Sequence, residues 1–525
     1  MSETIRLRLK PEESADRSAL ERRIAEKAGK APVDFRITRK SIDARQRQVW
    51  VEMDVLASFS ADDPLLPAFN PKDFKPVAPD APQVVIVGAG PAGLFAALRA
   101  IELGWRPVVV ERGKPVEDRL HDVVALQKSG KLDPESNFCF GEGGAGAFSD
   151  GKLFTRSKKR GDVKEVLALL HQHGAKEDIL YETHPHIGSD KLPGVIRNIR
   201  HRIVENGGEI LFSTKFESLV FKDGEVAGIV TEDGREISGP VILATGHSAK
   251  DVYRYLHSAG VPLEAKGFAM GVRLEHPQQL IDSIIYHNPK GRGEYLPAAE
   301  YRMAVQVDGR GVYSFCMCPG GVIVPAVSAA GESVVNGMSS SARSGRWANS
   351  GMVVEIRPED IESSQPENVA DEMGMLEFQQ GVEKRFFEEA KSLSAPAQRM
   401  KDFVDGKLSK SLPPSSYVPG LHPADLSKLL PPHVSDRLRK GLRIMGKRYP
   451  GFLTNDAVLI GLESRTSSPV RISRDPETLH HPAYKGLYPA GEGAGYAGGI
   501  VSAAIDGINA MNAIAGVNRQ KADDR

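Results

Sequence analysis

Three glycines stand where a short apolar run gives way to an Ala- and Leu-rich segment: Gly88, Gly90 and Gly93, in G-x-G-x-x-G spacing. Gly88 permits a tight turn, Gly90 leaves room for a pyrophosphate to approach the backbone, and Gly93 allows close packing of a helix on a strand. The helix that we expect to start at Pro91 and Ala92 directs its free N–H groups toward the phosphates. The pattern predicts a dinucleotide-binding turn.

A carboxylate completes the unit. A second apolar run, Val108–Val110, ends at Glu111, and Arg112 follows it. Glu111 can accept hydrogen bonds from the ribose hydroxyls of an adenosine, and an acid at this position favours a free ribose over a 2′-phosphate. Residues 82–112 therefore predict a βαβ unit, and Arg112 is included among its ligand contacts.

A second glycine-dense loop runs from Asn137 to Leu153. It does not stand between a strand and a periodic helix, so it is not a second dinucleotide fingerprint. Crowded glycines suit a backbone that lies against a large flat ligand, and an ordinary surface loop is the alternative. The residues predicted to contact the ligand are Gly143, Gly144, Gly146, Ser149 and Asp150.

Two further segments point to the same ligand. An apolar strand over Val241–Leu243 ends in Ala-Thr-Gly at Gly246, after a predicted β-meander. Farther along, a short strand leads to Gly491 and Glu492, and a helix is expected from Ile500. A carboxylate at Glu492 can bind the ribityl hydroxyls of FAD, and the helix dipole stabilises negative charge on a reduced flavin. FAD rather than NAD is the predicted cofactor, with further contacts at Gly491, Glu492, Gly498, Gly499 and Ile500.

The composition of the chain limits the kinds of partner and the cellular location that we expect for it. Lys plus Arg equals Asp plus Glu, at 68 each in 525 residues, so no excess charge indicates a nucleic-acid or membrane partner. Three cysteines cannot form a disulfide framework, which favours a reducing, cytoplasmic compartment. No apolar run reaches the roughly 20 residues of a membrane helix, and the charged first residues are not typical of a signal peptide. A small-molecule substrate is expected.

Hydrophobic periodicity divides the chain into segments. An alternating apolar pattern around one helix predicts a small α+β domain in the order βαββ, and a proline-rich stretch predicts an extended linker. The expected fold class is α/β, a Rossmann-like FAD-binding domain with an inserted α+β cap or substrate domain. The segments are residues 1–58 (N-terminal domain), 59–81 (linker), 82–250 (FAD-binding domain, first part), 251–449 (inserted domain) and 450–525 (FAD-binding domain, second part).

Together, the glycine segments resemble the FAD domain of the glutathione-reductase-like flavoproteins, which often have Gly-Asp where this chain has Gly491-Glu492. More closely, nearly the whole chain is similar to a family of bacterial FAD-dependent proteins labelled NAD(FAD)-utilising dehydrogenases. The motifs that carry this likeness are EGGAGAFSDGKL (142–153), THPHIGSDKLP (183–193), CMCPGG (316–321), GLESRTSSPVR (461–471) and PAGEGAGYAGGI (489–500). The resemblance implies an FAD-dependent oxidoreductase, with NAD(P)H as a candidate transient reductant.

The chain departs from the glutathione-reductase type in two ways. It has no second G-x-G-x-x-G between a strand and a helix, and no Cys-x4-Cys or Cys-x-x-Cys pair. Both departures point away from a disulfide reductase. One Rossmann unit with an inserted cap is closer to hydroxylase-like or fumarate-reductase-like flavoproteins.

Polar side chains outside the glycine segments are the candidates for catalysis. His184 and His186 can exchange a proton near neutral pH, with a purely structural pair as the alternative. Arg465 can hold a carboxylate or phosphate, or fix its own loop through an ion pair. Cys316 and Cys318 form a Cys-x-Cys pair whose disulfide would be strained, so buried apolar thiols are the favoured interpretation. No metal site is expected, because no third ligand accompanies the histidines.

Three functions stay open. The preferred hypothesis is hydride transfer between a reductant and an organic substrate through flavin N5. A flavin-dependent monooxygenase is the second, and a non-catalytic flavoprotein that binds a partner is the third. The mildly basic residues 1–58 are the candidate docking surface, or else a solvated face, since no aromatic RNA-binding motif accompanies the charge.

Overall fold

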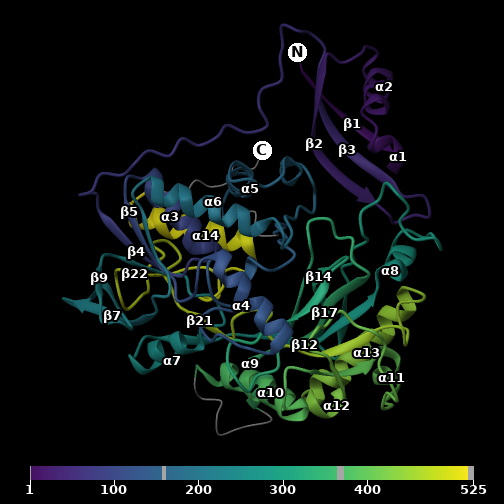
Figure 1. The fold of residues 1–525 in the computed structure, drawn as a ribbon. Coiled ribbons are helices and arrows are strands. Elements are labelled where there is room, and N and C mark those ends of the chain that lie inside the picture. Colours follow the sequence, from purple (N-terminus) through teal and green to yellow (C-terminus); the bar gives the residue numbers. More distant parts are fainter. Residues whose placement is uncertain (1, 156–160, 363–371, 518–525) are drawn as a thin grey trace.

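The computed structural model describes residues 2–155, 161–362 and 372–517 (Figure 1). The elements of the first unit are β1 (Glu3–Leu9), α1 (Pro11–Ser14), α2 (Arg17–Ala28), β2 (Asp34–Asp43) and β3 (Trp50–Ser58). The strands form an antiparallel sheet in the order β1-β3-β2. Alternate side chains of β1, from Ile5 to Leu9, are buried against Leu20 and Ile24 of α2. The predicted βαββ order is confirmed.

The second unit is a parallel sheet whose strands come from distant parts of the chain. In spatial order they are β22 (Leu487–Pro489), β10 (Val241–Leu243), β4 (Gln83–Val87), β5 (Arg106–Val110) and β6 (Glu209–Leu211). Neighbouring strands in this order run parallel. The carboxyl ends of β4, β5 and β10 therefore lie at one edge, which is where ligands bind in such sheets.

Alternation along β4 explains the two layers that cover this sheet. Val84 and Ile86 belong to the core shared with helices on one face, whereas Val85 and Val87 belong to the core on the other face. The helices of the first face include α3 (Pro91–Glu102), α6 (Leu192–Glu205) and α14 (Ile500–Ile514). The second face packs on an antiparallel meander of β7 (Phe216–Lys222), β8 (Glu225–Thr231) and β9 (Glu236–Ser238), and on α7 (Lys250–Ser258). The unbroken apolar run from Val84 to Val87 is the expected result of burial on both faces.

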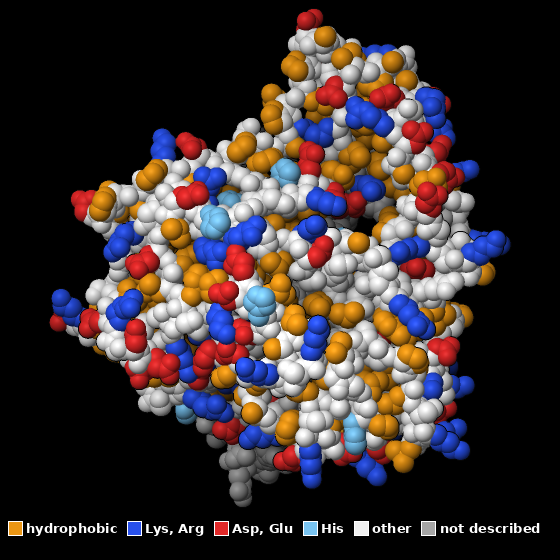
Figure 2. Space-filling view, in the orientation of Figure 1, with side chains coloured by type: hydrophobic (Ala, Val, Ile, Leu, Met, Phe, Trp, Pro, Cys, Tyr) orange, Lys and Arg blue, Asp and Glu red, His pale blue; other side chains and the backbone are white. Residues whose placement is uncertain are grey.

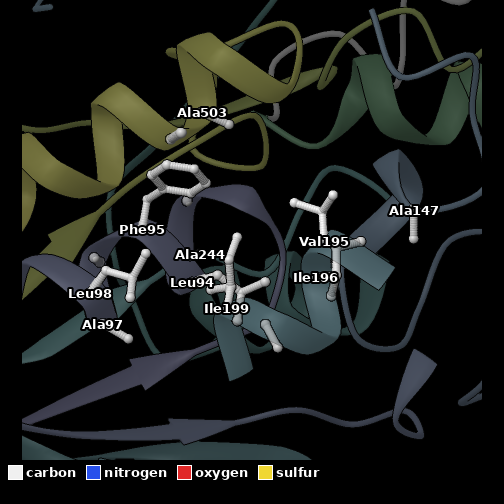
Figure 3. Packing of buried hydrophobic residues seen from close by; sticks show 14 of the residues in the cluster. Leu94, Phe95, Ala97, Leu98, Ala147, Val195, Ile196, Ile199, Ala244 and Ala503 are labelled. Atoms are coloured by element: carbon white, nitrogen blue, oxygen red, sulfur yellow. The ribbon is translucent and has the colours of Figure 1, made fainter. Parts of the chain in front are cut away.

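Helices α3 and α14 approach each other closely. Figure 3 shows the ring of Phe95 pointing from α3 toward α14, the helix that carries Ala503. A Cβ added at Gly507 of α14 would lie 1.9 Å from the backbone oxygen of Ala92 in α3, so only glycine fits there. The last helix is thereby held against the first glycine turn.

The third unit is a larger, mostly antiparallel sheet. In spatial order its strands are β13 (Ala304–Val307), β14 (Arg310–Cys318), β17 (Trp347–Ile356), β12 (Phe268–Pro277), β20 (Val458–Glu463), β18 (Ala395–Arg399) and β19 (Leu421–Pro423). Strand β20 pairs with β12 and β18, although its residues fall within the segment predicted to be the second part of the FAD-binding domain. Its run of buried apolar residues carries no signal of which sheet it joins, and this explains the difference.

The remaining elements cover the two sheets or connect them. They are α4 (Val116–Ser129), α5 (Val163–Gln172), α8 (Gln278–Ile285), α9 (Pro358–Glu362), α10 (Gly374–Ala390), α11 (Met400–Asp405), α12 (Leu426–Leu429), α13 (Pro432–Arg448) and the short strands β11 (Leu263–Ala265), β15 (Val322–Pro325), β16 (Val335–Met338) and β21 (Val470–Ile472). Residues 59–81 form the long connection that crosses from the first unit to β4 in Figure 1.

The surface is of mixed character. Figure 2 shows Lys and Arg interspersed with Asp and Glu over the visible face. None of the helices in the described ranges combines the length and apolar character that a membrane crossing requires. A cavity of about 750 Å³ lies between the first unit and the large sheet, with Arg39, Asp54 and Arg302 on its wall. A docking role for residues 1–58 stays a prediction.

Candidate cofactor and active site

A cavity of about 360 Å³ opens at the carboxyl edge of the parallel sheet, within the range usual for ligand pockets. The predicted cofactor-binding residues on its wall are Gly88, Gly90, Pro91, Ala92, Glu111, Arg112, Gly144, Gly146, Ser149, Asp150, Gly246, Gly491, Glu492, Gly498, Gly499 and Ile500. The other two predicted contacts, Gly93 and Gly143, are not among the described residues that line the cavity, and both are closely packed. A Cβ at Gly93 would lie 1.9 Å from the Gly88 oxygen, and one at Gly143 would lie 2.4 Å from Ile196.

The first glycine turn leaves open space where a phosphate is expected to approach. Gly88 adopts φ +106°, which favours glycine, and its N–H donates to Val110 at 2.8 Å. Gly90 caps α3, and Pro91 follows as its first residue. The nearest atom to a Cβ built on Gly90 is the Gly144 Cα at 3.9 Å, so the space beside Gly90 is open to the cavity. The N-terminus of α3 therefore faces an open space that a side chain at position 90 would fill.

Glu111 ties the two glycine loops together. Its Oε2 accepts from the Ala89 N–H at 2.8 Å, and its Oε1 accepts from the N–H groups of Gly113 at 2.9 Å and Gly141 at 3.0 Å. A carboxylate has about four lone-pair sites, so capacity remains for a ribose hydroxyl. The side chain is 5% exposed and lines the cavity.

Arg119, on α4, holds the second glycine loop and was not foreseen from the sequence. It is fully buried, and its Nε donates to the Asn137 oxygen at 2.8 Å. Its Nη1 donates to the oxygens of Glu142 and Gly144, each at 2.8 Å. Burial lowers the pKa of Arg119 to about 10. The sequence does not distinguish a buried arginine on a charged helix from an arginine that is exposed to solvent.

Glu142 anchors the same loop from the other side. Its Oε2 accepts from the Val116 N–H at 2.8 Å, at the start of α4, and from Arg200 of α6 at 2.9 Å. Burial raises the pKa of Glu142 to about 7. Arg119 and Glu142 thus fix a loop whose glycines supply no side chains of their own.

The last glycine segment brings a second helix N-terminus to the cavity. The Gly491 N–H donates to Asp506 Oδ2 at 2.7 Å, which links the loop to α14. A Cβ at Gly498 or Gly499 would meet no atom within 4 Å, so this end of α14 is open. Glu492 lies on the wall, with its Oε2 3.7 Å from His247 Nδ1.

Charged and sulfur-containing side chains gather near this end. Lys152 Nζ lies 3.0 Å from Asp150, whose carboxylate also accepts from Arg343 Nε at 3.0 Å. Lys152 and Arg343 hold the pKa of Asp150 well below its usual range, although burial opposes them. Cys316 lies on the same cavity wall as Lys152.

The predicted catalytic histidines are not part of this wall, although His186 forms an isolated β-bridge with Lys152, which is. Among the described residues that line the cavity, neither His184 nor His186 is included. His184 is half-exposed, pairs with Glu300 and stands edge-on to Phe154, with ring centroids 5.2 Å apart. His186 Nε2 lies 3.2 Å from the Ser341 oxygen, and burial together with Arg343 lowers its pKa. A catalytic role for either histidine stays a prediction, with His184 reaching the cavity only through Phe154.

Arg465 does line the cavity, but its donors are engaged with protein groups. Its Nε and Nη2 each donate to Glu383 at 3.1 Å, and Nη2 also donates to Glu332 at 2.6 Å. Its Nη1 donates to Ser328 Oγ at 2.8 Å. Lys250 Nζ lies 2.8 Å from both of these glutamates, so the four side chains form a buried, charge-balanced cluster. This arrangement favours the loop-fixing interpretation of Arg465.

Family comparisons match three parts of the chain. Residues 83–122 match an FAD binding domain, residues 267–466 match the description "FAD-dependent protein, C-terminal domain-like", and residues 1–58 match a domain of unknown function. The features of the cavity fit FAD, because the open space at Gly90 and the start of α3 suit a pyrophosphate and the buried carboxylate suits a ribose. The protein is an FAD-dependent oxidoreductase.

Comparison of whole chains gives the particular family. A protein of Clostridium beijerinckii, described as uncharacterized, is 41% identical over 521 residues, which cover 94% of this chain and 95% of that protein. The chain belongs to the same family as this clostridial protein.

Solved structures with detectable likeness include several flavoenzymes. They are glycerol-3-phosphate dehydrogenase from Bacillus halodurans complexed with FAD (12% identity, 84% of this chain and 66% of that one, TM-score 0.36), a geranylgeranyl bacteriochlorophyll reductase-like protein from Thermoplasma acidophilum (12%, 83% and 79%, TM-score 0.36) and L-amino acid deaminase from Proteus vulgaris (11%, 85% and 96%, TM-score 0.34).

Proposed function

We propose that FAD extends along the 360 Å³ cavity and that the protein transfers a hydride between a reductant and an organic substrate. The observation that carries this proposal is the meeting of two helix N-termini and one buried carboxylate on a single cavity wall. Glu111 marks the adenosine end, the start of α3 at Gly90 marks the pyrophosphate, and the start of α14 marks the isoalloxazine end. Each of these groups suits the part of FAD assigned to it.

When bound, FAD supplies two-electron exchange at its N5 position. The chain supplies orientation and electrostatics. The open N-terminus of α14 at Gly499 stabilises the negative charge that a reduced ring carries near its pyrimidine edge. Lys152, on the same wall, adds a positive charge at this end. Both features favour reduction of the cofactor.

The substrate is proposed to enter beside Phe154. The ring of Phe154 lies on the cavity wall, and 38% of the surface of this residue is exposed. Arg302 stands over this ring, with its guanidinium carbon 4.2 Å from the ring centroid. An aromatic face next to the flavin end suits an organic substrate with apolar surface.

NAD(P)H is the proposed reductant. The test is anaerobic stopped-flow absorbance of the purified FAD-loaded protein in the main visible flavin band, after mixing with NADH or with NADPH. Rapid bleaching by either supports the proposal and justifies a screen of acceptors. Bleaching by dithionite alone contradicts the nicotinamide part and indicates a dehydrogenase reduced by its own substrate or a non-catalytic flavoprotein.

Two further results separate the other functions. Oxygen consumption that is coupled to formation of a hydroxylated product would indicate a monooxygenase, not an enzyme that transfers a hydride to its substrate. A colourless protein that cannot be reconstituted with FAD would overturn the placement of the cofactor. Gly90→Val protein is the matched blank, because it is expected to fold without binding FAD.

A further inference from the structure

Cys316 and Cys318 lie side by side at the flavin end of the cavity. Cys316 is partly exposed and belongs to the cavity wall, whereas Cys318 is fully buried behind it. The Cys318 thiol donates to the backbone oxygen of Cys316, with Sγ and O 3.4 Å apart, so the buried thiol lies directly beside the residue on the wall. The buried setting that was expected for both residues is found for Cys318, whereas Cys316 is only partly buried and lies on the cavity wall.

The backbone of β14 departs from regular strand geometry at this pair. In a regular strand, alternate residues have Cα atoms about 6.6 Å apart and near-parallel side chains, which strains a disulfide because its Cβ atoms must approach to about 4 Å. The pairing of β14 with β17 is irregular between Phe315 and Cys318, and Cys316 adopts φ +44°. A left-handed conformation is unusual for a residue other than glycine and redirects this side chain toward the cavity.

Two cations surround the pair. The fully buried Arg273 places Nη2 3.3 Å from Cys318 Sγ and 2.6 Å from the Cys316 backbone oxygen. Lys152 Nζ lies 4.0 Å from Cys318 Sγ. The Cys318 thiol, Lys152 and Arg273 lower the pKa of Cys316 to about 5, although burial opposes them. A thiolate in a partly exposed, electropositive setting is the reactive form of cysteine.

We propose that Cys316 and Cys318 form a dithiol–disulfide pair that exchanges two electrons with the flavin. The inference rests on the proposed placement of FAD in this cavity. As the Sγ–Sγ bond forms, the Cys316 thiolate and the Cys318 thiol lose two electrons and one proton, and oxidised FAD accepts both electrons and the proton. In reverse, reduced FAD returns them, the bond breaks, and one thiolate and one thiol are restored. A dithiol or disulfide substrate is the chemical class that Cys316 can reach from the cavity.

The test counts electrons in the full-length FAD-loaded protein. The protein is oxidised with ferricyanide, desalted, and titrated anaerobically with dithionite while the flavin absorbance is followed. A flavin and a disulfide each take up two electrons, so the native protein is expected to consume about four per flavin. Cys316→Ser and Cys318→Ser are each expected to consume about two. Cys139→Ser, which removes a thiol from the same cavity wall, is the matched control and should keep the native value.

Mass spectrometry gives a readout that does not depend on the cofactor. After ferricyanide treatment, denaturation and alkylation, the peptide that holds both cysteines should lack alkyl groups and be two hydrogens lighter than its dithiol form. The same result is expected for FAD-free protein, so failure of FAD binding is distinguished from failure of the thiol pair. A native titration of about two electrons, with both cysteines alkylated after oxidation, would overturn the proposal.

Discussion

The carboxylate of Glu111 accepts a hydrogen bond at 3.0 Å from the backbone N–H of Gly141, which lies 30 residues farther along the chain. The same carboxylate accepts from Ala89 in the first glycine turn. One side chain therefore sets the spacing between the two loops that bound the cavity. An acid predicted to bind the ribose also assembles the site.

Glu111→Gln should weaken FAD binding, although the glutamine amide keeps one oxygen that can face the ribose. Its NH2 group would face at least one of the three N–H donors that the carboxylate now accepts, which costs about 1–3 kcal/mol for an unsatisfied donor. We expect the Kd for FAD to rise by about fivefold to about 150-fold, measured by quenching of flavin fluorescence. Glu264→Gln, at an exposed carboxylate, is the control. An unchanged Kd would show that the loops keep their spacing without Glu111.

Gly90→Val and Gly93→Ala should separate binding from folding. A Cβ at Gly90 has ordinary contacts only, and the residue adopts φ −77°, so the valine variant should fold but lose FAD and its yellow colour. A Cβ at Gly93 meets the Gly88 oxygen at 1.9 Å, so the alanine variant should lose about 3 kcal/mol or more of stability. Thermal melting of the FAD-free proteins checks the contrast, and a destabilised Gly90→Val protein would contradict it.

Glu383→Gln should destabilise the fold strongly. It removes one negative charge from the cluster of Lys250, Arg465, Glu332 and Glu383, which leaves a buried positive charge uncompensated. Loss of one partner of a buried pair costs about 3–5 kcal/mol, measured by urea unfolding. Asp308→Asn, which removes the exposed pair with Lys440, is the control and should change stability by less than about 1 kcal/mol.

The same cluster predicts an acid limit of stability. Arg465 and Lys250 lower the pKa of Glu383 to about 2, although burial opposes them. A carboxylate with a lowered folded-state pKa contributes stability above its unfolded pKa of about 4.3, and this contribution is lost as the pH falls toward 2. Glu383→Gln protein should lack this part of the pH dependence, and an identical acid profile for both proteins would contradict the assignment.

His276 predicts a second dependence on pH, in a less acidic range. It is fully buried, its Nε2 lies 2.8 Å from the Phe452 oxygen, and burial lowers its pKa to about 4. The unfolded chain takes up this proton near pH 6.5 and the folded protein only near 4, so stability should fall as the pH decreases through this window. The expected loss is about 3 kcal/mol. His276→Gln keeps a donor for Phe452 and should flatten the unfolding free energy between pH 6.5 and 4, measured by chemical denaturation.

Local patterns predicted the parallel sheet well, because its signals lie within short segments. The turn at Gly88 and the helix after it require particular residues at particular positions, and such requirements can be read from one stretch of sequence. Strand β20 illustrates the opposite case, since its apolar run is equally suited to either sheet. Pairing partners are set by tertiary packing, which short windows do not encode.

The flavin end of the cavity was less predictable for the same reason. Cys316, Lys152 and Arg273 come from three distant segments, and their types alone do not indicate that they meet. The expectation that a Cys316–Cys318 disulfide would be strained rested on the Cys-x-Cys spacing alone, whereas the positive φ of Cys316 and the irregular pairing of β14 are properties of the fold. His184 and His186 are not among the described residues that line the cavity, and their catalytic role stays a prediction.

The pairing of α3 with α14 has a consequence for biosynthesis. The cavity wall extends to Ala503, so the site is incomplete on the ribosome until the start of α14 has been made. At 5–20 residues per second, roughly 20–80 s separate the synthesis of β5 from that of α14. Through that interval the apolar surface of α3 lacks its permanent neighbour and is exposed to chaperones or to aggregation. FAD therefore binds only after α14 has been made, although the glycine turn that begins the site is made much earlier.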